Sequence, residues 1–137
     1  TTVNGASTYF EHEVGLDQIT YSTIGVATTT PIVSFIQSGD FALHIDGDGE
    51  IFTKIRRFIP DFKRLYGNAE ITIYLKDYPS ETAVSSPLGP FTIDSSVDKV
   101  DTRARGRAAS LRIANTGSSE SWRYGTFRAD VQPDGRR

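Results

Sequence analysis

The sequence predicts an all-β fold, a single antiparallel β-sandwich or barrel-like domain of about seven to nine short strands with little or no helix. Apolar residues repeat at a spacing of two, and Gly, Thr, Ser and Asp are spread through the whole chain. Short apolar runs separated by turn residues are typical of sandwiches and barrels. A chain of 137 residues can bury one core, so residues 1–137 are predicted to form one domain.

The first strands are predicted between residues 31 and 58. Residues 31–43 (PIVSFIQSGDFAL) and 50–58 (EIFTKIRRF) are rich in β-branched and aromatic side chains. Gly39 invites a bulge in the first segment. Residues 46–49 (DGDG) lie between the two segments and are typical of a hairpin turn.

Pro60 and Asp61 are expected to end the second of these strands, and Gly67 begins the turn to the next. In residues 70–76 (EITIYLK) polar and apolar side chains alternate, which is the pattern of a half-buried strand. Residues 78–90 contain three prolines and little periodicity, which predicts a long surface loop.

The remaining chain is predicted to be extended, with a turn at residues 115–119. Gly106 is expected to join two of its strands. Four extended segments are predicted, at residues 91–93, 100–105, 107–114 and 122–131.

The arginine-rich last third is the main functional feature of the sequence. Arg103, Arg105 and Arg107 lie two apart, so on one strand they would project from one face about 7 Å apart. Leu111 has the same parity as these arginines. A bulge at Gly106 would change the phase, so that the arginines and the apolar residues need not share a face.

Charge is unevenly distributed along the chain. Residues 1–99 carry 7 Lys/Arg and 13 Asp/Glu, whereas residues 100–137 carry 8 Arg, no Lys and 4 acids. The planar guanidinium suits bidentate pairing with carboxylates. We therefore expect the arginines to face acids, either in the same chain (Asp61, Asp77 or Asp130) or in a neighbouring subunit. Phosphates are the alternative, but a duplex-binding protein is usually basic overall and this net charge is −2.

Nothing in the sequence favours a catalytic or metal-binding function. The chain has no Cys, and residues 46–50 (DGDGE) lack the twelfth-position Glu and flanking helices of a calcium loop. His12 and His44 have neither clustered metal ligands nor the partners of a catalytic triad. No catalytic residue, metal or cofactor is predicted and the chain is not expected to be an enzyme, although a glycosidase-type carboxylate pair stays open. No run of eighteen apolar residues occurs, so no membrane span is predicted.

Six short motifs follow one another in the chain: EHExG (11–15), FIQSGDF (35–41), IPD (59–61), DxRxRGR (101–107), WRxG (122–125) and PDGR (133–136). Each is weak alone, but their order over residues 9–137 resembles the C-terminal module of tail proteins of short-tailed bacteriophages. Those long chains are similar to β-propeller nozzle or tail-hub subunits. The chain contains no Met, which agrees with a fragment or module of a longer chain that has its propeller upstream.

The resemblance implies a structural role in the virion without chemistry. It implies a ring of copies, expected to be a hexamer, around the DNA exit channel, with other tail or portal-adaptor proteins as partners and non-specific contact with double-stranded DNA. As a hypothesis, five residues contribute to the subunit interface or brace the strands behind it. They are Arg103, Arg105, Arg107, Arg123 and Trp122.

Two alternatives remain open. A receptor-binding or carbohydrate-binding tail module would expose Trp122 and Tyr124 around a shallow groove. A DNA-contacting channel lining would instead place the arginines on the lumen. Core packing is the ordinary role of such aromatic residues in strands.

Overall fold

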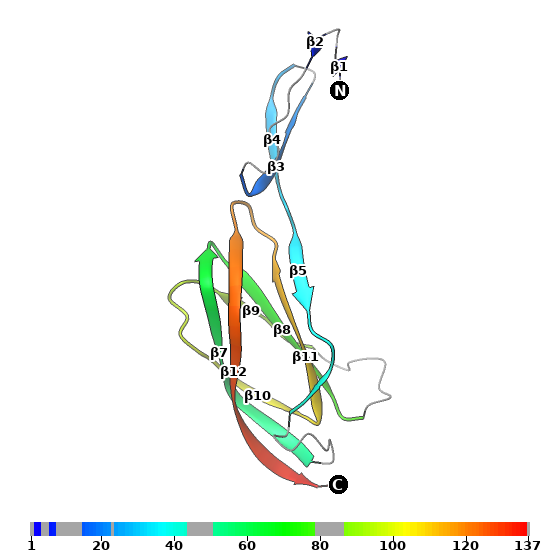
Figure 1. Ribbon diagram of the computed structural model, residues 1–137, viewed down its shortest axis with the longest axis vertical. Helices are drawn as coiled ribbons and strands as arrows, with labels where there is room; N and C mark the ends of the chain where they lie inside the picture. Colours follow the sequence, from blue (N-terminus) through cyan, green and yellow to red (C-terminus); the bar gives the residue numbers. More distant parts are fainter. Residues whose placement is uncertain are drawn as a thin grey trace.

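A computed structural model describes residues 2–3, 6–7, 15–22, 24–43, 51–78 and 87–136. It confirms the predicted all-β antiparallel fold, with twelve strands and no helix among these residues. Two sheets pack face to face as a sandwich, and a hairpin projects from one end of it (Figure 1). The turn predicted at residues 46–49 and the two histidines, His12 and His44, lie outside the described residues.

One layer of the sandwich has the strand order β10-β7-β12 and the other has the order β5-β11-β8-β9, with β6 also paired to β11. All of these pairs are antiparallel. The strands of the sandwich are β5 (Ser34–Gln37), β6 (Phe41–Ala42), β7 (Ile51–Tyr66), β8 (Ala69–Lys76), β9 (Leu88–Ile93), β10 (Val100–Gly106), β11 (Ala108–Asn115) and β12 (Ser121–Arg136). Outside it, β1 (Thr2–Val3) pairs with β2 (Ala6–Ser7) and β3 (Asp17–Tyr21) pairs with β4 (Ala27–Pro31).

The core lies between the two layers and follows from the alternation of side chains in the strands. Ile71 and Ile73 of β8 are buried, as their spacing predicts. Phe58 of β7 is fully buried, and its ring centroid lies 5.5 Å from those of both Phe91 and Phe127. Burying one such side chain contributes about 1.5–3 kcal/mol to folding.

Four predicted boundaries are wrong. The last strand, expected at residues 122–131, runs from Ser121 to Arg136. The expected strand at residues 31–43 is divided between β4, β5 and β6. The expected loop at residues 78–90 ends earlier, because Leu88–Ile93 is a strand; residues 79–86 lie outside the described part. β7 continues past Pro60 to Tyr66, because beyond Phe58 it pairs only with β12. A missing N–H is tolerated in such an edge stretch.

Candidate assembly interface

The three arginines of the predicted ladder do not lie on one strand. Arg103 and Arg105 are exposed on β10, whereas Arg107 follows the strand, where the chain crosses to the facing sheet. The backbone N–H of Arg107 donates to the carbonyl of Lys76 on β8, at 2.9 Å. The change of phase expected at Gly106 does occur, but a change of sheet produces it and not a bulge at that residue. The inward side of a strand reverses when the chain passes between facing layers.

Two of these arginines share an aromatic ring. The guanidinium carbon of Arg105 lies 4.0 Å from the ring centroid of Phe52, and that of Arg107 lies 4.6 Å from it. Arg105 also forms an ion pair with Asp134 of β12. The ring and the carboxylate offset the repulsion between the two guanidiniums. Within the chain, these contacts brace β10 against β7 and β12.

Two of the acids expected to pair with the ladder pair with other arginines. Asp61 binds Arg128 at 2.8 Å, and Asp130 lies 3.7 Å from Arg57. Arg57 on the central strand β7 also lies 3.8 Å from Asp101 on β10, so it is flanked by an acid on each side. Arg57, Arg105 and Arg128 are therefore paired within the sheet, whereas Arg103 forms no ion pair with a described residue.

Trp122 and Arg123 lie at the other end of the sandwich from the ladder (Figure 1). Arg123 is opposite Arg64 on β7, whereas Arg105 is opposite Lys54, ten positions away along the same strand. That separation is roughly 33 Å in an extended strand. The structure therefore divides the five predicted interface residues into two groups.

The aromatic residues considered as a sugar platform are partly buried. Trp122 and Tyr124 both pack against the core cluster, and the Tyr124 ring meets Phe62 edge-on at 5.4 Å. Burial, with a smaller contribution from the charge of Asp61, raises the pKa of Tyr124 to about 12. Tyr124 is thus a packing residue and does not form an open platform.

Among the described residues, the most exposed large apolar side chains are at the Trp122 end, on residues 17–22 and 24–33, called the arm below. The β3–β4 hairpin of the arm projects from the sandwich and pairs with no other described strand (Figure 1). Tyr21 is 70% exposed and Ile24, at the hairpin turn, is 86% exposed. An isolated two-stranded hairpin is marginally stable in water, and a contiguous exposed apolar surface marks a site of contact with another molecule.

Asp17 fixes the base of the arm to the sandwich. Its carboxylate accepts hydrogen bonds from the backbone N–H of Ser119, at 2.8 and 2.9 Å, and from the Ser119 hydroxyl at 3.1 Å. Ser119 belongs to the turn between β11 and β12. The arm is therefore attached to the same turn that precedes Trp122.

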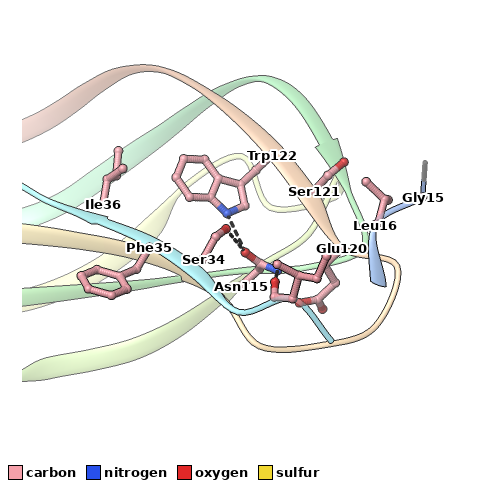
Figure 2. A pocket seen from close by; sticks show the side chains of 10 residues that line it. Gly15, Leu16, Ser34, Phe35, Ile36, Asn115, Glu120, Ser121 and Trp122 are labelled. Atoms are coloured by element: carbon pink, nitrogen blue, oxygen red, sulfur yellow. Dashed lines mark hydrogen bonds between the residues drawn. The ribbon is translucent and has the colours of Figure 1, made fainter. Parts of the chain in front are cut away.

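Asn115 is a second attachment point and is 3% exposed. Its side-chain oxygen accepts hydrogen bonds from the Ser34 hydroxyl and, at 3.3 Å, from the Trp122 indole N–H (Figure 2). Its side-chain nitrogen donates to the carbonyl of Ile32 at 3.1 Å. One buried amide thus connects the end of the arm, strand β5 and strand β12.

An open hollow of about 460 Å³ lies beside this amide, and we call it the apolar hollow (Figure 2). Glu120 also lines it, but its carboxylate accepts backbone N–H groups of Asn68, Thr116 and Gly117. The apolar side chains that line the hollow are Leu16, Ile32, Phe35, Ile36 and Trp122. This end of the molecule therefore presents both a projecting arm with exposed apolar side chains and a hollow whose one charged lining residue is hydrogen-bonded within the chain.

The arm was not among the predicted functional residues, although the sequence contains a signal for it. No charged residue occurs from Gln18 to Gly39, a run of 22 residues in a chain that is 23% charged. Thr, Ile and Val dominate this run, which favours β-structure while omitting the charges that keep exposed edge strands soluble. Such a composition indicates a segment that another surface covers.

Comparison of the sequence with protein-family models and with curated proteins gave no match. Within the described ranges, no group of three or more His, Asp or Glu residues is placed to hold a metal ion. The described residues form no helix that is long and apolar enough to cross a membrane.

Proposed function

We propose that this chain is a structural module of a phage tail ring, a nozzle or hub subunit that acts by subunit–subunit contacts and not by chemistry. The arm carries the proposal, because its hairpin is uncharged beyond Asp17, exposes large apolar side chains such as Tyr21 and Ile24, projects from the sandwich and is not covered by other described strands. The order of the sequence motifs supports the phage tail context. The arm independently supports assembly.

A second copy of the chain is the partner that we assign to the arm. A surface that covers an uncharged segment must itself be neutral, since burying an unpaired charge is costly. The apolar hollow meets this requirement except at Glu120, whose carboxylate is already hydrogen-bonded to backbone N–H groups, and it is present on every copy. The arm tip and the hollow are different parts of the surface, so this contact is head to tail, and such contacts close into rings when the rotation permits.

The arginines support this arrangement in two ways. Arg105 and Arg107 brace the strands through Phe52, as described above. Arg103 is exposed and forms no ion pair with a described residue, which leaves it available to the acidic body of a neighbouring copy.

The test is the assembly state of the full chain, measured by light scattering after size exclusion and by electron microscopy. We expect closed rings for the wild type and monomers for Ile24→Lys, because a buried lysine at the arm tip opposes docking. Gln132→Lys is the matched control, since it adds the same charge at an exposed position on β12. A monomeric wild type, or rings formed equally well by Ile24→Lys, would overturn the proposal.

A DNA-contacting channel lining is the second candidate, and one observation favours it. A separate hollow on the outer face of the β10-β7-β12 sheet is lined by four cations and one acid. These residues are Lys54, Arg56, Arg57, Arg103 and Asp101, together with Thr102. Retention of duplex DNA that falls steeply between low and moderate salt, and that Arg56→Gln weakens, would support this candidate. Retention insensitive to both changes would exclude it.

A further inference from the structure

A third hollow, of about 580 Å³, lies beside the apolar hollow and shares Leu16, Ser121 and Trp122 with it. Its four other lining residues are three cations and a tyrosine, with no acid among them. The cations are Lys63, Arg64 and Arg123, and the tyrosine is Tyr66. We call this site the cationic hollow.

The cations of this hollow are not balanced within the described chain. Arg64 and Arg123 are directly opposite each other on β7 and β12, and like charges in that position destabilise a sheet. Elsewhere on the same two strands arginines have carboxylate partners, as Arg57 and Arg128 show. No ion pair joins Lys63, Arg64 or Arg123 to any acid in the described ranges.

The two carboxylates nearest to these cations in the sequence are already engaged. Asp61 pairs with Arg128, and the two oxygens of Glu120 accept three backbone N–H groups from the neighbouring turns. Neither can turn toward the hollow without giving up these bonds, each of which is strengthened by the carboxylate charge. The hollow retains a concentrated positive charge that suits an anion from outside.

One arginine of the hollow is already held in place. The guanidinium of Arg64 lies 4.6 Å from the ring centroid of Tyr66, and one of its nitrogens donates to the Tyr66 hydroxyl at 3.2 Å. Ordering a long side chain before a ligand arrives reduces the entropy lost on binding. Tyr66 and Trp122 also give the hollow an apolar and aromatic wall beside its cations.

We propose that the cationic hollow binds an acidic sugar. The carboxylate of a uronic acid would pair with Arg64 and Arg123, and its ring would lie against the aromatic wall. The volume falls within the range of about 300–1,000 Å³ that is usual for small-ligand sites. Three cations in one compact hollow suit a single carboxylate better than a nucleic-acid backbone, which needs a groove that follows successive phosphates. The proposal does not depend on the arm or on ring assembly.

The experiment is a titration of the full chain with trigalacturonic acid, followed by calorimetry. We expect binding that Arg123→Gln and Arg64→Gln each weaken about tenfold or more, since each removes a charge-assisted pair. Arg128→Gln is the matched control, because Arg128 is exposed on the same strand and bonds to Asp61, and it should bind like the wild type. A neutral trisaccharide should not bind.

Four outcomes would overturn the inference. These are no binding of trigalacturonic acid to the wild type, equal weakening by Arg128→Gln, equal binding of the neutral trisaccharide, and tighter binding of an acidic peptide or a thymidine oligonucleotide than of the sugar. Circular dichroism of each variant shows that a loss of binding is not a loss of folding. Because the readout is binding and not oligomeric state, its failure is distinct from a failure of the assembly proposal.

Discussion

The carboxylate of Asp17 binds both the N–H and the hydroxyl of Ser119, which lies 102 residues later in the chain. This contact joins the first strand of the arm to the turn between β11 and β12. Ser119 has a φ of 60°, a conformation that L residues rarely adopt. The geometry of the arm's base thus depends on a turn formed by the far end of the sequence.

Replacing Asp17 with Ala is expected to release the base of the arm and leave the sandwich folded. The variant loses hydrogen bonds to a charged group, which are worth about 1.5–3 kcal/mol. Amide hydrogen exchange of residues 18–21 and 27–30 should become about tenfold faster or more. Asp94→Ala is the control, because Asp94 bonds only to its local turn. Unchanged exchange in the arm of the Asp17 variant would contradict this prediction.

Replacing Asn115 with Leu is expected to destabilise the protein by about 2–4 kcal/mol. The change keeps a similar volume but removes the partners of Ser34, Trp122 and the Ile32 carbonyl in a buried site. Denaturant-induced unfolding measures the loss. Ser34→Ala removes only one of these partners and should cost about 1 kcal/mol. Equal stability of Asn115→Leu and the wild type would show that the amide is not a structural hub.

Stability is expected to fall between about pH 10 and pH 12, and Tyr124 is the cause. Its pKa is raised from 10.0 to about 12 in the folded chain, so the folded state holds the proton more tightly than the unfolded state. The contribution of Tyr124 to the free energy of unfolding is fully present below pH 10. It is lost as the pH rises through the pKa of Tyr124 in the folded state. Unfolding midpoints measured across this interval should decrease less steeply in Tyr124→Phe.

The same substitution should leave stability at neutral pH within about 0.5 kcal/mol of the wild type, or raise it. The Tyr124 hydroxyl is buried and has no hydrogen-bond partner in the described part of the chain, so removing it leaves nothing unsatisfied. Tyr21→Phe, which keeps Tyr124, should retain the alkaline slope of the wild type. An identical slope in both variants would assign the effect to another group.

Gly125→Ala is expected to cost about 1–3 kcal/mol, because the added methyl group would lie 2.7 Å from the backbone oxygen of Asp61. β7 and β12 would have to separate at this point. Gly39→Ala is the matched control, since nothing lies within 4 Å of its added methyl group. Thermal unfolding of the two variants provides the comparison, and equal midpoints would contradict the close approach.

Local patterns predicted much of this fold. Alternation at Ile71 and Ile73 identified the buried face of β8, and the parity conflict around Gly106 identified a real change of side. The passage of β7 through Pro60 was not predictable from its neighbours in sequence, because it depends on where β10 stops pairing. Strand partners are set by long-range packing, which local composition does not encode.

The candidate site was harder to predict for the same reason. Arg105 can pair with Asp134 only because β10 and β12 flank the same strand, β7. The sequence alone does not show which acid lies next to each arginine. The cationic hollow depends on the register that places Arg123 opposite Arg64. The uncharged run from Gln18 to Gly39 was visible in the sequence, but only the structure shows that its first part, in the β3–β4 hairpin, projects from the sandwich, whereas its later part, β5, pairs with β11.

The pairing of β7 with β12 has a consequence for biosynthesis. The residues of β7 pair with residues of β12 that are synthesised 55 to 85 positions later, from Tyr66 with Ser121 to Ile51 with Arg136, and Phe58 likewise packs against the later Phe127. The β3–β4 hairpin is synthesised before both strands, so it leaves the ribosome before the β10-β7-β12 sheet can form. The nascent chain therefore exposes Ile24 and the unpaired edge of β7 at the same time, which favours aggregation of incomplete chains.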